Sequence, residues 1–146
     1  MTKAETYEQA WRLGFKGDFS QVDSLYHPEY SAIDHTTSIK SNLNDDKVVV
    51  STLSDSIVLG AYEVVSESEE NLTIRVYSRF KDYEIYRCAT TQATYKDGKI
   101  ITQKTDGREL DHDPSEGQDW NWEDYEIYRC ATSGNVQRWK NNYSEN

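Results

Sequence analysis

Apolar residues recur at four-residue spacing near the start of the chain. Tyr7, Trp11 and Phe15 share one side of residues 6–16, which predicts an amphipathic helix there. Gly17 follows at the position where helices commonly end on a left-handed residue. The chain is therefore expected to open with a helix packed through an aromatic face.

Two further helices are expected. Asp18 suits the N-cap of a short second helix, which should end before Pro28 because proline disfavours helical geometry in the residue before it. A third helix is expected over residues 45–56, although the β-branched run at 47–52 also fits a strand. The expected buried side of the third helix holds Val49, Leu53 and Ile57.

Alternation of apolar and polar residues predicts strands in the rest of the first 105 residues. The clearest is 72–80, followed by 83–95, a turn at Asp97-Gly98 and a returning strand at 99–104. Shorter stretches at 30–35 and 62–67 also read as strands. Helices followed by an antiparallel meander predict an α+β domain with the helices on one face of the sheet.

Charge and composition narrow the classes of partner. The 146 residues carry 26 Asp and Glu against 16 Lys and Arg, a net charge of −10. Nucleic acids and anionic membranes require clustered positive charge, so neither is expected as a partner. The apolar runs are too short to span a membrane and the first residues lack a signal-peptide core, so we expect a cytoplasmic protein. Cys88 and Cys130 are expected as reduced thiols.

The end of the chain contains a copied segment. Residues 124–132 repeat residues 82–90 letter for letter. We therefore divide the chain into a domain over 1–108 and an acidic, Trp-rich extension over 109–146. The copy either adds a strand to a sheet edge or to a partner subunit, or forms a poorly ordered extension.

Several of these motifs together resemble a known family. Gly17-Asp18-Phe19, the stretch from Val22 to Tyr30, and the hairpin Tyr95-Lys96-Asp97-Gly98-Lys99-Ile100 are similar to the SnoaL-like branch of the NTF2-like superfamily. The resemblance covers about residues 6–105. It implies a cystatin-like cone, in which N-terminal helices pack on a strongly curved antiparallel sheet around a ligand pocket. It also implies a homodimer formed through the sheet.

The resemblance places a candidate catalytic acid or base on the first strand. Asp34, with His35 beside it, falls where the ketosteroid isomerase branch carries its general base. A carboxylate in an apolar pocket has a raised pKa, which suits proton abstraction. The positions of that branch's oxyanion donors hold Ala10 and Thr90, so steroid isomerisation is not expected. The alternative role for Asp34 is to cap the loop after the strand.

Ring residues are the expected walls of the pocket, although each could equally belong to the core. The ligand-pocket candidates are Trp11, Tyr30, Tyr62, Tyr77, Tyr86, Thr90 and Tyr95. No metal or nucleotide cofactor is expected, because the sequence lacks HxH, HExxH, CxxC, GxGxxG and P-loop motifs.

Three functions remain open from the sequence. The first is a binding protein for a small polar cyclic or carbonyl-containing molecule. The second is a cofactor-independent isomerase, cyclase or dehydratase that uses Asp34. The third is a structural or accessory dimerisation module.

Overall fold

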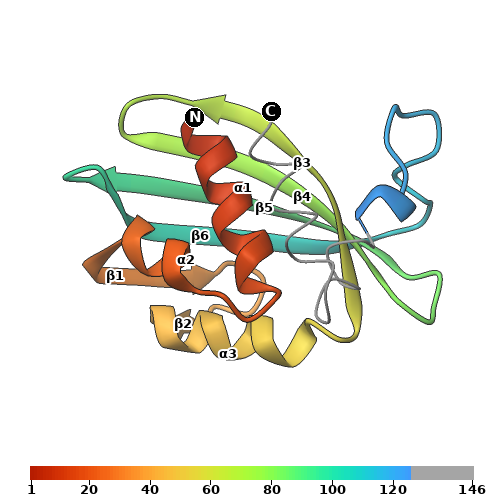
Figure 1. Cartoon of the computed structure of the whole chain (residues 1–146), viewed down its shortest axis with the longest axis horizontal. Helices are drawn as coiled ribbons and strands as arrows, with labels where there is room; N and C mark the ends of the chain where they lie inside the picture. Colours follow the sequence, from red (N-terminus) through yellow and green to blue (C-terminus); the bar gives the residue numbers. More distant parts are fainter. Residues whose placement is uncertain (126–146) are drawn as a thin grey trace.

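A computed structural model describes residues 1–125 of the chain. A six-stranded curved sheet, in the order β2-β1-β6-β5-β4-β3, carries the helices on one face (Figure 1). This confirms the predicted α+β class. The elements are α1 (Lys3–Gly14), α2 (Ser20–Leu25), β1 (Tyr26–Asp34), β2 (Lys40–Ser41), α3 (Leu43–Leu53), β3 (Ile57–Glu67), β4 (Asn71–Phe80), β5 (Tyr86–Lys96) and β6 (Lys99–Leu110).

The sheet is antiparallel except where β1 meets β6. Strands β3 to β6 form the expected meander, whereas β1 runs parallel to β6. The predicted turn between β5 and β6 is confirmed: Asp97 and Gly98 have φ values of 55° and 76°, as a two-residue hairpin turn requires at both positions. The ladder between β3 and β4 shifts register between Leu59 and Tyr62, and such irregularities bend a strand.

Helix α1 begins earlier than its apolar spacing predicts. Thr2 and Glu5 form a reciprocal capping box, which starts the helix at Lys3 rather than at residue 6. At the other end Gly17 has a φ of 91° and the Asp18 amide donates to the Leu13 carbonyl. The glycine therefore ends the helix by the left-handed closure that its position predicts.

The second helix ends before Pro28, as predicted, but Pro28 does not mark its end, because this proline lies inside β1. Helix α2 already stops at Leu25. The ladder between β1 and β6 shifts register between Tyr26 and Ser31. Proline has no N–H to give to a ladder, and strands accommodate it at such interruptions.

Helix α3 is confirmed, but its predicted buried side is wrong. Val49 is 55% exposed and Leu53 is 37% exposed, whereas Leu43 and Val50 pack against the core. The capping box of Asn42 and Asp45 fixes where the helix begins. The side that meets the core depends on how α3 approaches β1, which its own spacing does not encode.

The copied segment is only partly described. In its first copy, Asp82–Ile85 precede β5 and Tyr86–Thr90 begin that strand. In the second copy only Asp124 and Tyr125 are described, so the prediction of an added strand falls outside the described residues. No helix in the described part of the chain is long and apolar enough to cross a membrane.

Candidate ligand pocket

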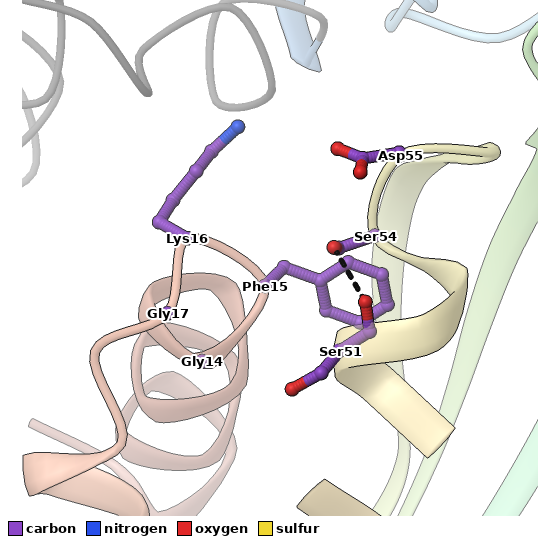
Figure 2. A pocket seen from close by; sticks show the side chains of 7 residues that line it. All are labelled: Gly14, Phe15, Lys16, Gly17, Ser51, Ser54 and Asp55. Atoms are coloured by element: carbon purple, nitrogen blue, oxygen red, sulfur yellow. Dashed lines mark hydrogen bonds between the residues drawn. The ribbon is translucent and has the colours of Figure 1, made fainter. Parts of the chain in front are cut away.

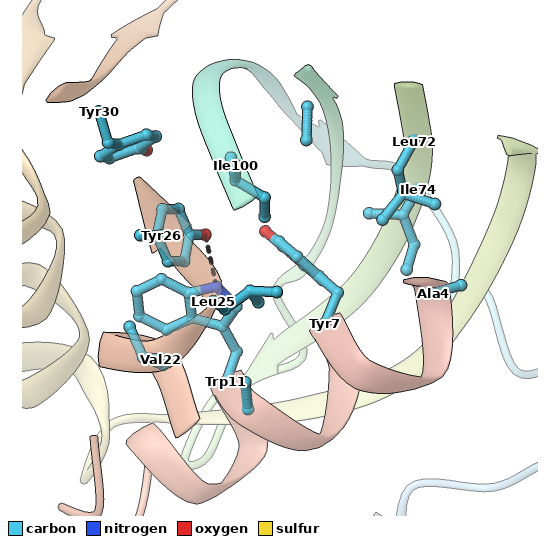
Figure 3. Packing of buried hydrophobic residues seen from close by; sticks show 12 residues of the cluster. Ala4, Tyr7, Trp11, Val22, Leu25, Tyr26, Tyr30, Leu72, Ile74 and Ile100 are labelled. Atoms are coloured by element: carbon cyan, nitrogen blue, oxygen red, sulfur yellow. Dashed lines mark hydrogen bonds between the residues drawn. The ribbon is translucent and has the colours of Figure 1, made fainter. Parts of the chain in front are cut away.

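Four of the predicted pocket residues lie together in the layer between the helices and the sheet. Trp11 and Tyr30 belong to the buried cluster (Figure 3). Tyr62 and Tyr95 are partly buried and pack against the same cluster. The Trp11 indole N–H donates to the Tyr26 hydroxyl at 2.9 Å. These rings therefore form a buried aromatic core, which is the alternative role that their spacing allowed.

Hydrogen bonds engage the hydroxyl groups of Tyr26 and Tyr30 in this aromatic core. The Tyr26 hydroxyl donates to the Gln103 side-chain oxygen, and the Tyr30 hydroxyl donates to Asp46 at 2.8 Å. Burial raises the pKa of the Asp46 carboxyl, while hydrogen bonds from Ser41 and Tyr30 work in the opposite direction. The Tyr95 hydroxyl is buried without a hydrogen-bond partner among the described residues. The interior is therefore a packed core in which side-chain hydrogen bonds connect some of the rings to neighbouring polar residues.

Asp34 is the last residue of β1 and His35 begins the turn that follows, and both are exposed. One Asp34 carboxylate oxygen accepts the backbone N–H groups of Thr36 at 2.9 Å and Thr37 at 3.2 Å. The His35 amide donates to the Thr105 carbonyl at 2.7 Å. The carboxylate therefore caps the turn after β1 and is not gathered with the aromatic residues.

An Asp34→Ala variant should lose about 1 kcal/mol of folding free energy, because two backbone amides lose their acceptor. Asp34→Asn should lose less, since its amide oxygen can still accept. Urea denaturation followed by circular dichroism measures both, with Asp82→Ala in an exposed loop as the control. Turnover of any substrate by the parent that disappears in Asp34→Asn would instead support the enzyme alternative.

The other predicted residues lie on the opposite face of the sheet, which we call the open face. Leu72 and Ile74 of β4 belong to the core under the helices, so alternation directs Tyr77 to the open face. By the same rule and the pairing of β5 with β4, Tyr86 and Thr90 share that face. The sequence therefore predicted one pocket from residues that the fold divides between two faces.

Residues 111–125 fold back onto the open face, and we call them the clasp. The Trp120 ring stacks on Tyr77 with centroids 6.0 Å apart, and the Trp122 ring lies 6.1 Å from that of Tyr86. The Trp122 indole N–H donates to Asp113 at 2.9 Å, which ties the clasp to itself. Trp122 is only 7% exposed, so its ring is buried although the rest of the clasp is exposed or half-buried.

A pocket of about 320 Å³ lies between the open face and the clasp. Tyr77 and Trp120 supply its rings, and β3 and β6 contribute Glu63 and Arg108. This volume suits a small molecule. The charged and polar residues contributed by the clasp are His112, Asp113, Glu116 and Gln118.

Local contacts shift the pKa values of two groups in this pocket. Burial of the phenol, followed by hydrogen bonding to Glu63, raises the pKa of Tyr77, so its hydroxyl stays protonated. Partial burial of Asp113 works to raise its pKa, but the hydrogen bonds from Trp122 and Ser115 outweigh burial and lower it. Tyr77 therefore keeps its proton and donates a hydrogen bond to Glu63, while Asp113 is an ionised structural tie.

A second, smaller pocket of about 200 Å³ lies where the ends of α1 and α3 meet (Figure 2). Lys16 and Asp55 lie at its two sides, and Phe15 is its one aromatic ring. The Ser54 hydroxyl donates to the Ser51 carbonyl at 3.1 Å. With a single ring and mostly polar walls, it is the weaker candidate for an organic ligand.

Neither a metal centre nor a reactive thiol emerges from the described geometry. In residues 1–125, no three His, Cys, Asp or Glu side chains gather in an arrangement suited to a metal. Cys88 is 2% exposed, and burial raises the pKa of its thiol. Cys130 lies outside the described residues. The pocket therefore offers hydrogen bonds, charge and ring surfaces as its means of recognition.

Sequence reasoning missed most of this pocket. Trp120, Arg108 and Glu63 were not predicted as pocket residues. The available signal was the pair Trp120 and Trp122 in an otherwise acidic, Gly- and Pro-containing stretch. Large apolar rings in such a stretch need a surface to cover them.

Comparisons with known proteins bear on the fold alone. No family model matches the chain, and no curated protein matches it. Among solved structures, an NTF2-like protein of unknown function from Cytophaga hutchinsonii superposes with a TM-score of 0.55 at 14% identity, covering 72% of this chain and 98% of that one. A steroid delta-isomerase from Pseudomonas aeruginosa gives 0.54 at 14% identity, covering 99% and 98%. An M. tuberculosis LEH-like epoxide hydrolase gives 0.52 at 8% identity, covering 73% and 84%.

The activities named for these structures differ from one another. Sequence identities this low do not show which residues of this chain form a functional site. Their shared architecture is a set of helices packed on a curved sheet, as in the described part of this chain. The chain therefore has the NTF2-like fold that its sequence motifs predicted.

Proposed function

We propose that the protein binds a small, polar cyclic or carbonyl-containing molecule in the pocket between the open face and the clasp, without chemical turnover. The pocket of about 320 Å³, with Tyr77 and Trp120 stacked at its wall, is the observation that carries this proposal. Stacked rings provide a flat apolar surface for a cyclic ligand, and the surrounding polar groups orient it.

Binding is favoured over catalysis because of where the carboxylates lie. Asp34 is exposed, caps a turn and lines neither of the two pockets. Asp113 in the pocket is already committed to Trp122 and Ser115. These positions support recognition of a ligand more than proton transfer to it.

Native mass spectrometry of freshly purified protein tests this proposal. The parent should carry the added mass of one small molecule, and Tyr77→Ala should weaken its binding at least tenfold, equivalent to about 1.4 kcal/mol. Tyr83→Ala is the matched control, because Tyr83 is 66% exposed in the loop before β5. Equal loss of the added mass in both variants, or binding unaffected by Tyr77→Ala, would exclude this pocket as the site.

A homodimer through the sheet, which the family resemblance implies, is a second proposal. Trp120 and Trp122 cover part of the open face within one chain. A dimer through this part of the sheet would therefore include the clasp in its interface.

A further inference from the structure

We infer that the ligand of the open-face pocket is an organic cation, an ammonium or amidinium group carried on a flat ring. The inference rests on the proposed function and adds the charge class of the ligand. The inference follows from the described walls of the pocket, which bring several carboxylates and two aromatic rings together with one basic side chain, Arg108.

Among the residues that line the pocket, carboxylates outnumber basic side chains. The lining includes Glu63, Asp113 and Glu116 against the single guanidinium of Arg108. Asp113 is engaged by Trp122 and Ser115. The chain as a whole carries a net charge of −10, so its long-range field also attracts cations and repels anions.

The carboxylates of Glu63, which accepts a hydrogen bond from Tyr77, and of Glu116 come from different parts of the fold. Glu63 belongs to β3 and Glu116 to the clasp. A cation held between them would join the sheet to the clasp. This arrangement differs from an acidic stretch along one exposed segment, because the two residues are brought to one pocket only by the tertiary fold.

The aromatic rings of the pocket also favour a positively charged ligand. The faces of Tyr77 and Trp120 carry negative electrostatic potential and attract cations placed over them. The clasp already shows this kind of contact, since the Arg79 guanidinium carbon lies 5.7 Å from the Trp122 ring centroid. Rings and carboxylates together therefore favour a ligand that is both flat and positively charged.

Arg108 is the feature that opposes this assignment. It could pair with a carboxylate on the ligand, and like Glu63 and Glu116 it is exposed to solvent, so water and salt weaken the interactions of all three charges alike. The carboxylates of the lining outnumber this one guanidinium. The geometry therefore makes an anionic ligand the alternative outcome of the test.

Three probes of similar shape test the charge class: benzylammonium, benzyl alcohol and benzoate. Binding is measured by isothermal titration calorimetry at pH 7 and low salt, on the full chain. Benzylammonium should bind at least fivefold more tightly than benzyl alcohol, and benzoate most weakly. Raising the salt to physiological strength should reduce the advantage of the cation, because the carboxylates are solvent-accessible.

Glu63→Gln and Glu116→Gln should each reduce the cation's advantage over the alcohol by at least twofold. Glu29→Gln is the matched control, because Glu29 is exposed on β1 and does not line the pocket. Melting curves by circular dichroism establish that the variants are folded. Tyr77→Ala should weaken benzylammonium binding, which places the probe in this pocket.

The outcomes distinguish a failure of the proposed charge class of the ligand from a failure of the proposed binding function. Equal binding of the three probes, or tightest binding of benzoate, overturns the charge class but leaves the pocket as a binding site. An advantage of the cation that is unchanged in both Gln variants also overturns it. No binding of any probe by the folded parent at millimolar concentration counts against the proposed function itself.

Discussion

Replacing Arg12 with alanine is expected to lower the free energy of unfolding by about 4 kcal/mol. The Arg12 side chain is 1% exposed. Its Nε lies 2.8 Å from Glu8, and one terminal nitrogen donates to the Gly60 carbonyl at 2.6 Å. Its guanidinium carbon also lies 4.7 Å from the Tyr62 ring centroid and 4.6 Å from that of Tyr125.

The loss is large because one side chain connects three parts of the fold. Arg12 joins α1 to the edge strand β3 and to the clasp, and its removal leaves the Gly60 carbonyl without this donor. Urea denaturation followed by circular dichroism gives the free energy. Arg12→Lys should recover only part of it, since lysine keeps the charge but lacks the planar fork.

Arg87→Ala serves as the control for Arg12, because Arg87 is exposed on β5. It should change the free energy of unfolding by less than about 0.5 kcal/mol. If Arg12→Ala lost no more than this control, the buried guanidinium would not be the tie between helix, sheet and clasp.

Replacing Gly60 with alanine is expected to detach the clasp at a cost of about 3 kcal/mol. An added Cβ would lie 2.7 Å from a ring carbon of Trp122 and 2.9 Å from one of Trp120. Neither ring can yield easily, because Trp122 is tied to Asp113 and Trp120 stacks on Tyr77. The indole emission should shift to longer wavelength as the two rings enter water.

Gly107→Ala is the matched control in another strand. A Cβ there would meet the Arg87 guanidinium at 3.2 Å, the flexible end of an exposed side chain that can move aside. Its emission spectrum should match that of the parent. A Gly60→Ala protein with parental stability and emission would show that the clasp does not depend on this close approach.

The Gly60→Ala variant also tests ligand binding and self-association. Because Trp120 lines the pocket, detachment of the clasp should weaken binding of the probe together with the stability. A change in solution mass between Gly60→Ala and the parent, measured by light scattering, would indicate that the open face takes part in self-association.

Sequence signals predicted a structural feature well wherever the residues that cause that feature lie within it. Asp97-Gly98 predicted the hairpin because the two residues themselves adopt positive φ. Gly17 predicted the end of α1 for the same reason. Pro28 misled the prediction because its fixed φ suits an irregular strand as well as a helix end.

The copied segment shows the limit of local sequence. Tyr83 and Tyr125 occupy the same position in two identical stretches. Tyr83 is 66% exposed, whereas the ring of Tyr125 lies over Arg12 and against Trp120. Neighbours distant in the sequence therefore set the environment of each tyrosine.

Short-range signals in the chain were sufficient to predict the order of the main helices and strands, the hairpin and the resemblance to the NTF2-like fold. These depend on backbone sterics and side-chain periodicity within short windows. Packing between distant segments places Trp11 and Tyr30 in the core, leaves Asp34 to cap a turn, and stacks Tyr77 on Trp120 at the wall of a pocket. A strand has two faces, and which face meets the helices and which meets the clasp depends on packing between segments far apart in the chain.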